Sequence, residues 1–281
     1  MQITKPFKFS YINAKCRALK SYSLKREFFL PLLSASGIGD IYSSLKRTNY
    51  GEFILEPEEL QILEGINKYF ENLFLKITHT LDKKEKEIFY LFFFKRKQII
   101  EKKLKYKNEK DIEEYFKKID LEFLKEIQTV LKSLSLHERQ VLKSIIGSYF
   151  DLLNLLTIIK FKFIYNLKTE EIFPFLINSY YKINLEILFK VGSASNFSEL
   201  SNLLIPFLKK EFNDYTSFRK AVYNYHIIQL NKAWYGFPFK ISVPFATLRL
   251  KEIEIKNIKA ILEGKKFNIS ADEIERMLLG V

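Results

Sequence analysis

The sequence predicts an all-α protein, and three observations support this class. Apolar residues recur at helical spacing along nearly the whole chain, as at Leu60, Leu63, Ile66 and Phe70. The chain of 281 residues has only 9 Gly and 7 Pro, so few positions suit tight turns. No run of alternating β-branched residues is bounded by Asn-Gly or Asp-Gly, so β-hairpins are not indicated.

Each helix is predicted from its apolar spacing and from the residues at its ends. Pro57 and Pro244 lie where a first helical turn accepts proline, whereas Pro174 and Pro206 should kink or end helices. Helices are predicted at residues 6–21, 25–35, 38–47, 57–79, 82–106, 109–132, 135–166, 170–191, 197–209, 214–230, 245–265 and 271–279.

Composition indicates a globular chain in a reducing compartment. Hydrophobic residues make up 47% of the sequence and aromatic residues 16%, far above the composition of disordered chains. The single cysteine, Cys16, cannot form an internal disulfide and is interpreted as a buried small side chain. No stretch reaches the roughly 18 uncharged apolar residues of a membrane span, and no signal peptide is visible, so secretion is not expected.

The formal net charge of +13 admits nucleic acid, an anionic membrane surface or an acidic protein as partner. Basic runs at 95–97 and 102–107 could bind phosphates, with Tyr106 available to stack. Acids at 109–114 follow closely, which favours a solvated helix face. The aromatic run 89–94 is interpreted as core, with a lipid or partner contact as the alternative.

Catalytic and cofactor-binding motifs are absent from the sequence. It contains no Walker A loop, Gly-x-Gly-x-x-Gly, His-Glu-x-x-His, Gly-x-Ser-x-Gly or Cys-x-x-Cys pattern. The three histidines, His79, His137 and His226, lie at unrelated spacings, so a metal site is not expected. We therefore predict no catalytic, cofactor-binding or metal-binding residues.

An internal repeat is the most informative feature. Residues 34–45 and 193–204 both read Ser-Ala-Ser, any residue, apolar, any residue, acid, apolar, then Leu after three positions. This pattern is typical of a helix start with an acid near the N-terminal dipole. Asn196 with Glu199 resembles a capping arrangement, for which Gly37 with Asp40 is the weaker counterpart.

A second repeated pair matches residues 151–162 with residues 254–265, and continues after a one-residue slip. An acid, an Asn, apolar residues and a Lys coincide. The favoured interpretation is that Asn154 and Asn257 hydrogen-bond neighbouring helices, and that the acid and the Lys pair with them; the alternative makes them partner contacts.

These repeats predict three similar helical lobes of about 100 residues, with the first most diverged. Approximate lobe boundaries are residues 1–108, which also receives C-terminal contacts, 109–192 and 193–281. Residues 87–103 occupy the equivalent place in the first lobe but lack the Asn. An array of similar lobes builds a concave face suited to gripping another protein, which indicates a scaffold.

Two end motifs carry a family resemblance. Residues 11–21 followed by 48–51 form the N-terminal motif, and 244–258 continuing to 264–265 form the C-terminal motif, while residues 151–155 resemble a middle version. With these motifs the chain resembles the C-type subunits of bacterial and archaeal V/A-type rotary ATPases, which are the counterparts of the d-type subunits of eukaryotic vacuolar ATPases.

The resemblance implies a funnel of three lobes with pseudo-threefold symmetry, placed on the cytoplasmic face of a membrane. Such a subunit is a non-catalytic part of the central stalk, present in one copy. It receives the rotating shaft of the soluble sector and sits on the proteolipid rotor ring, and thereby couples ATP synthesis or hydrolysis to proton or sodium transport. Anionic lipid headgroups are a further implied contact, and nucleic acid is not. The alternative function, from composition alone, is a basic all-helical nucleic-acid-binding module.

The chain departs from the family pattern in length and loops. It is shorter than usual, and Pro-Gly-Gly-like loops are missing after Pro174 and Pro206. The expected partner contacts are the basic residues near the first and last lobes, namely Arg17, Arg26, Lys46, Arg47, Arg249 and Lys256.

Overall fold

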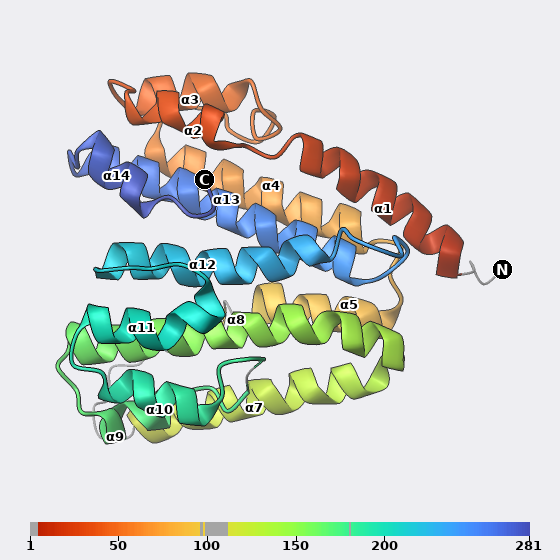
Figure 1. The fold of residues 1–281 in the computed structure, drawn as a ribbon. Coiled ribbons are helices and arrows are strands. Elements are labelled where there is room, and N and C mark those ends of the chain that lie inside the picture. The colour runs from red at the N-terminus through yellow and green to blue at the C-terminus, as the bar shows by residue number, and fades with distance from the viewer. Residues whose placement is uncertain (1–4, 96–97, 99–111, 180) are drawn as a thin grey trace. The chain divides into compact units, whose positions relative to one another are not determined.

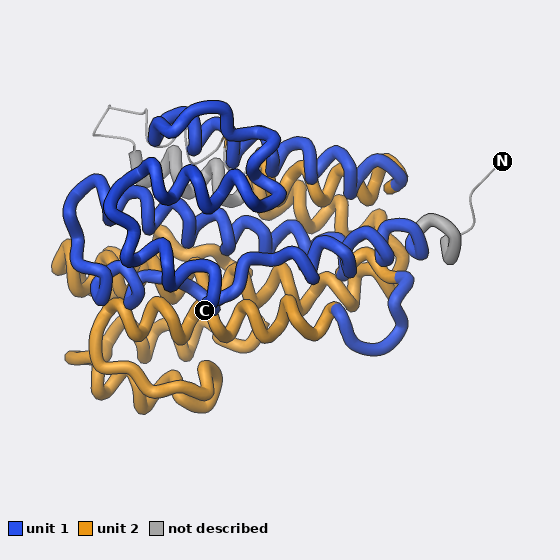
Figure 2. The backbone as a smooth tube through the Cα atoms, turned by 90° about the horizontal axis from the view of Figure 1, so that it is seen from above, with its two compact units in different colours: residues 1–80, 234–239, 243–281 blue, residues 81–233, 240–242 orange. Residues whose placement is uncertain are grey.

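The computed structural model describes residues 5–95, 98, 112–179 and 181–281. Every element in these ranges is a helix, which confirms the predicted all-α class (Figure 1). The chain divides into two compact units, shown in different colours in Figure 2. Unit 1 comprises residues 1–80, 234–239 and 243–281, and unit 2 comprises residues 81–233 and 240–242.

Unit 1 joins the two ends of the chain. Its helices are α1 (Lys5–Ser21), α2 (Arg26–Leu33), α3 (Ile38–Lys46), α4 (Glu59–Thr78), α13 (Ser242–Lys266) and α14 (Ala271–Met277). Figure 1 shows α13 running beside α4, where Lys259 Nζ donates to Asn67 Oδ1 at 3.4 Å. Fully buried side chains from both ends of the sequence form its core, among them Phe29, Ile41, Ile62, Phe245, Ile258 and Leu262.

Unit 2 is built mainly from one continuous stretch of chain around a long central helix. Its elements are α5 (Lys83–Tyr90), a π-helical segment η1 (Leu91–Lys95), α7 (Ile112–Ser133), α8 (Leu136–Phe163), α9 (Thr169–Ile172), a 3₁₀ turn η2 (Phe173–Phe175), α10 (Leu185–Ser193), α11 (Phe197–Leu208) and α12 (Tyr215–Lys232). Helix α8 packs against α12 and α10. Phe92 and Tyr149 lie with ring centroids 4.8 Å apart, so the aromatic run contributes to the core as predicted.

Helices α8 and α13 end in the same way. Asn166 and Asn268 both adopt φ 54°, the left-handed conformation that closes many helices. The following N–H groups reach back to the last turn, from Leu167 to the Phe161 carbonyl (3.1 Å) and from Ile269 to the Gly264 carbonyl (2.8 Å). The second sequence repeat therefore corresponds to a repeated local structure.

The predicted helix 170–191 is wrong, because the structure breaks it between η2 and α10. Pro174 has no N–H to continue the helix, and side chains of α8 hold the backbone that follows in a non-helical path. Pro206 lies inside α11, which ends two residues later. The predicted helix 82–106 is not a single α-helix, because its part at 91–95 is π-helical; most of the rest lies outside the described residues.

Helix α8 is long and apolar enough to cross a membrane by length and composition, in contrast to the expectation from the sequence. Of its most apolar window, 72% is buried inside the protein. It also carries the buried polar residues Ser148, Asp151 and Asn154. These features are those of the core helix of a folded unit.

Candidate functional site

The polar residues of α8 form a cluster that we call the α8 anchor: Asp151, Asn154 and Lys162. The Asp151 carboxylate accepts hydrogen bonds from the backbone N–H groups of Tyr181 (2.9 Å) and Lys182 (3.0 Å). Asn154 binds both backbone groups of one residue, since its Nδ2 donates to the Ile177 carbonyl (2.9 Å) and its Oδ1 accepts from the Ile177 N–H (2.8 Å). The anchor thus fixes the irregular segment that precedes α10.

The α13 anchor, Glu254, Asn257 and Lys265, has the same arrangement in unit 1. The Glu254 carboxylate accepts from the backbone N–H of Leu24 (3.0 Å), in the segment that precedes α2. Asn257 Nδ2 donates to the Leu279 carbonyl (2.9 Å), and its Oδ1 accepts from the Leu279 N–H (2.8 Å). Each Asn bonds to backbone of its own unit, which favours the structural interpretation over a partner contact. The predicted partners were wrong, however, because Ile177 and Leu279 lie in non-helical segments and not in neighbouring helices.

The two lysines close the anchors at equivalent helix ends. Lys265 Nζ donates to the Leu33 carbonyl at the end of α2 (2.6 Å), and Lys162 Nζ donates to the Gly192 carbonyl near the end of α10. Residues 33 and 192 stand one position before the two Ser-Ala-Ser segments of the first repeat. The two sequence repeats therefore belong to one repeated arrangement of helices. This arrangement occurs once in unit 1 and once in unit 2.

A buried tyrosine completes each carboxylate site. Tyr50 lies in the N-terminal motif and Tyr225 in no motif, and the sequence analysis assigned this role to neither. Tyr225 on α12 donates its hydroxyl to Asp151 Oδ2 (2.7 Å), and Tyr50 donates to Glu254 Oε1 (2.7 Å). The tyrosines come from different elements, so neither repeat contains them as a matched pair.

Burial raises the pKa of Asp151, and the donors around it oppose that shift. The backbone N–H of Tyr181 and the hydroxyl of Tyr225 both favour the charged form. In unit 1 Glu254 has a cation beside it, since Lys251 Nζ donates to Glu254 Oε1 at 2.8 Å. Lys251 and Glu254 are only 3% and 6% exposed, so this ion pair is buried.

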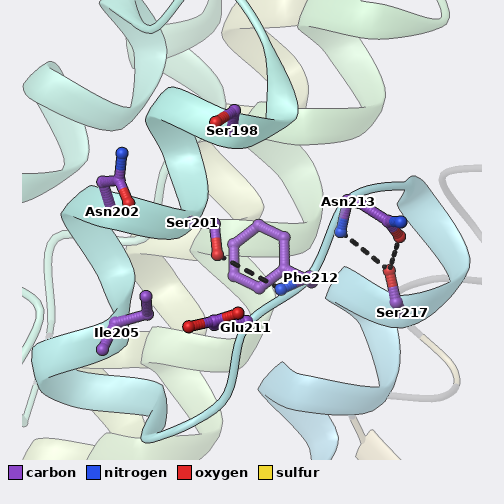
Figure 3. Close-up of a pocket in the computed structure, with 8 residues that line it drawn as sticks. All are labelled: Ser198, Ser201, Asn202, Ile205, Glu211, Phe212, Asn213 and Ser217. Atoms are coloured by element: carbon purple, nitrogen blue, oxygen red, sulfur yellow. Dashed lines mark hydrogen bonds between the residues drawn. The ribbon is translucent and has the colours of Figure 1, made fainter.

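The structure also contains a pocket of about 470 Å³ in unit 2, between α11 and the segment leading into α12 (Figure 3). Ser201 Oγ accepts from the Phe212 N–H at 3.2 Å, which holds that segment against α11. Its lining is mostly polar and consists of Ser198, Ser201, Asn202, Ile205, Glu211, Phe212, Asn213 and Ser217.

A second pocket of about 380 Å³ lies in unit 1 between α1, α4 and the loop after α3. Its lining includes Lys15, Thr48, Asn49 and Lys76, and the first three of these belong to the N-terminal motif. Lys15 Nζ donates to the Lys76 carbonyl at 3.3 Å beside this pocket. Neither pocket was predicted from the sequence.

A model of the family described as ATP synthase (C/AC39) subunit matches residues 95–277. That span covers well over half of the chain and contains both anchors. The chain belongs to this family. The resemblance to the C-type subunits of V/A-type ATPases is thereby confirmed, and the protein is a subunit of that membrane-associated complex. A search of curated proteins found no match.

Six basic residues are expected to contact partner subunits, and three of them lie on or beside separate helices. Arg17 lies on α1, Arg47 directly follows α3, and Lys256 lies on α13 beside the buried Asn257. All three are exposed, as contact residues require.

Arg26, Lys46 and Arg249, which are also expected contact residues, bind groups within unit 1. Arg26 forms an ion pair with Glu275 at 2.7 Å while remaining 59% exposed. Lys46 Nζ donates to the carbonyls of Gly51 (2.9 Å) and Ile54 (3.0 Å). Arg249 is 3% exposed and pairs with Glu252.

The remaining candidate residues are accounted for individually. Cys16 is fully buried, and burial raises the pKa of its thiol to about 11. His226 is buried with its Nδ1 2.9 Å from Ser148 Oγ, whereas His79 and His137 are exposed. Of the basic runs, 102–107 and most of 95–97 lie outside the described residues.

Proposed function

We propose that this chain is the non-catalytic central-stalk subunit of a V/A-type ATPase or ATP synthase. In this role it is a socket that couples the rotating shaft of the soluble sector to the proteolipid ring during proton or sodium transport. The observation that carries the proposal is the family match over residues 95–277. The sequence supports the non-catalytic role, because it holds no phosphate-binding loop and ATP chemistry then belongs to other subunits.

A coupling subunit needs stiff parts, since compliance would dissipate torque. Both units support this requirement with close-packed aromatic and aliphatic cores, which have low compressibility. Each anchor adds buried hydrogen bonds that join an irregular segment to a long helix. We propose that residues 1–108, 109–192 and 193–281 form three similar helical lobes around a funnel.

The proposed partners are the central-shaft subunits on one side and the rotor ring on the other, at the cytoplasmic face of the membrane. The net charge of +13 suits an acidic shaft end and neighbouring anionic lipid headgroups. The proposed contact residues are those whose side chains are exposed, namely Arg17, Arg26, Lys46, Arg47 and Lys256. A single copy per complex is expected.

Co-purification tests this function. The tagged chain is isolated from gently washed native membranes, and the bound proteins are identified by mass spectrometry. Recovery of shaft and proteolipid-ring subunits is the expected result. Recovery of RNA-binding proteins together with salt-sensitive binding to nucleic acid would overturn the proposal in favour of the nucleic-acid-binding alternative.

A charge-reversal variant and a matched control sharpen the test. Arg47→Glu should weaken recovery of the shaft subunits. Glu52→Gln, an exposed change in the same loop, is the matched control and should leave recovery unchanged.

A further inference from the structure

The pocket of unit 2 has a counterpart in unit 1 that is filled by the chain itself. The offset of 159 residues in the first repeat pairs Ser201 with Tyr42 and Ile205 with Lys46. Tyr42 donates its hydroxyl to the Leu55 carbonyl (3.0 Å), as Ser201 bonds to the Phe212 N–H in unit 2. In both units this position therefore joins the helix to the backbone of the segment that follows.

The two units differ one helical turn further along α3 and α11, at the position of Lys46 and Ile205. In unit 1 the ammonium group of Lys46 donates to the Gly51 and Ile54 carbonyls, at 2.9 and 3.0 Å, and so bridges the helix and the loop that follows it. In unit 2 the same position is Ile205, whose side chain is too short and too apolar to do so. The space between α11 and the segment leading into α12 is left as the pocket of about 470 Å³.

The pocket carries a negative charge at the end where Ile205 lies. Figure 3 shows Ile205, on α11, and Glu211, on the following segment, at the same end of the pocket. Glu211 is exposed and forms no ion pair with any cation in the described part of the chain. The other polar side chains of the lining, including Ser198 and Asn202, are uncharged.

We propose that this pocket binds a lysine side chain from a neighbouring subunit of the complex. The ammonium group binds the Glu211 carboxylate, as a charge-assisted hydrogen bond, and the aliphatic stem lies along Ile205. The partner's lysine thus takes the place that Lys46 takes in unit 1. The identity of the neighbour as an ATPase subunit rests on the proposed function; the preference of the pocket for lysine does not.

Carbodiimide cross-linking in native membranes tests the proposal, because this reagent joins a carboxylate to an amine in direct contact. We expect a cross-link between Glu211 and a lysine of a co-purified subunit, and its loss in Glu211→Gln. Ile205→Lys supplies the amine from the chain itself and should lower the intermolecular cross-link about tenfold while forming an internal one. Ile205→Leu is the matched control and should keep the intermolecular cross-link.

A second measurement does not depend on the complex. The isolated chain is titrated with N-acetyl-lysine methylamide and, separately, with the norleucine analogue, and amide NMR shifts are recorded. Shifts at residues 205 and 211–213 from the lysine analogue alone, abolished by Ile205→Lys, support the pocket even if no ATPase subunit co-purifies. Equal shifts from both analogues, or no Glu211 cross-link although shaft and ring subunits are recovered, would overturn it.

Discussion

The α8 and α13 anchors use one hydrogen-bonding scheme with two different ways of stabilising a buried carboxylate. Glu254 faces the ammonium group of Lys251, three residues earlier on α13. The equivalent position on α8 is Ser148, which bonds to His226 and supplies no charge to Asp151. Asp151 depends instead on two backbone N–H groups and the Tyr225 hydroxyl. The comparison shows that the two anchors share their hydrogen-bond geometry, whereas among the described residues only the α13 anchor places a cation beside its buried carboxylate.

The anchors also differ in the length of chain that they close. In unit 2 Asp151 and Tyr181 are 30 residues apart, whereas in unit 1 Glu254 and Leu24 are 230 residues apart. Closing the longer loop costs more chain entropy and must follow synthesis of nearly the whole chain. We expect unit 2 to fold before unit 1 for this reason.

The largest effect is expected when the cation is removed from unit 1. Lys251→Met leaves the Glu254 carboxylate buried and unpaired, and should lower the free energy of unfolding by about 3–5 kcal/mol. Ser148→Ala, at the equivalent position of unit 2, removes a neutral hydrogen bond and should cost only about 1 kcal/mol. Urea unfolding followed by circular dichroism measures both.

The matched control is a double variant that also neutralises Glu254, the partner of Lys251 in the ion pair. Lys251→Met with Glu254→Gln should recover part of the loss, because neither member of this pair then leaves a buried charge. Similar losses for Lys251→Met and Ser148→Ala would show that the two anchors are not electrostatically different.

The next effect concerns the two asparagines. Asn257→Leu leaves the N–H and carbonyl of the buried residue Leu279 without partners, which should cost about 2–4 kcal/mol. Asn154→Leu should cost less, about 1–2 kcal/mol, because Ile177 is half-buried and water can reach its backbone. Thermal and urea unfolding of the two variants test this order, and a larger loss for Asn154→Leu would contradict it.

A pH dependence distinguishes the Asp151 site. Because burial raises its pKa above the unfolded value of 3.8, the folded chain holds a proton that the unfolded chain has lost. The contribution of this carboxyl to the free energy of unfolding is therefore complete below pH 3.8 and is lost as the pH rises through the folded-state pKa. Tyr225→Phe removes a donor that favours the charged form, so it should raise the pKa further and steepen this fall.

At pH 7 the Tyr225→Phe variant should be less stable by about 1.5–3 kcal/mol, and the difference should shrink towards about pH 4. Urea unfolding across this range provides the measurement. A difference that stays constant with pH would mean that the hydroxyl does not act on the charge of Asp151.

The smallest effect is expected at the anchor lysines, whose side chains are half-buried. Lys265→Met removes a donor from the Leu33 carbonyl and should cost about 1 kcal/mol. Lys162→Met should cost about 0.5 kcal/mol, because the Gly192 carbonyl retains the hydroxyl of Thr169 at 2.9 Å. Paired urea unfolding curves resolve the two, and the reverse order would show that the lysines act mainly by packing.

Much of the fold was predictable from local pattern. Asn196 Oδ1 accepts from the Glu199 N–H to cap α11, as predicted, and Ser270 with Glu273 caps α14 in a capping box. The continuous helix 170–191 failed, because its apolar spacing is helical while Pro174 and the side chains of α8 impose another path. The pocket was not predicted, since it depends on how the segment after α11 folds back so that Glu211 and Ile205 line the same space.

The sequence by itself determined most of the helices, their caps and the equivalence of the two repeats, because these depend on residues within a few turns of one another. It also indicated the family, through motifs at both ends of the chain. Only the tertiary structure decided which tyrosine reaches each buried carboxylate, that the Lys251–Glu254 pair is buried, and that Lys46 bridges helix and loop in unit 1 where unit 2 has a pocket. Those outcomes depend on burial and on partners brought together from distant or non-helical segments, and a one-dimensional pattern carries neither.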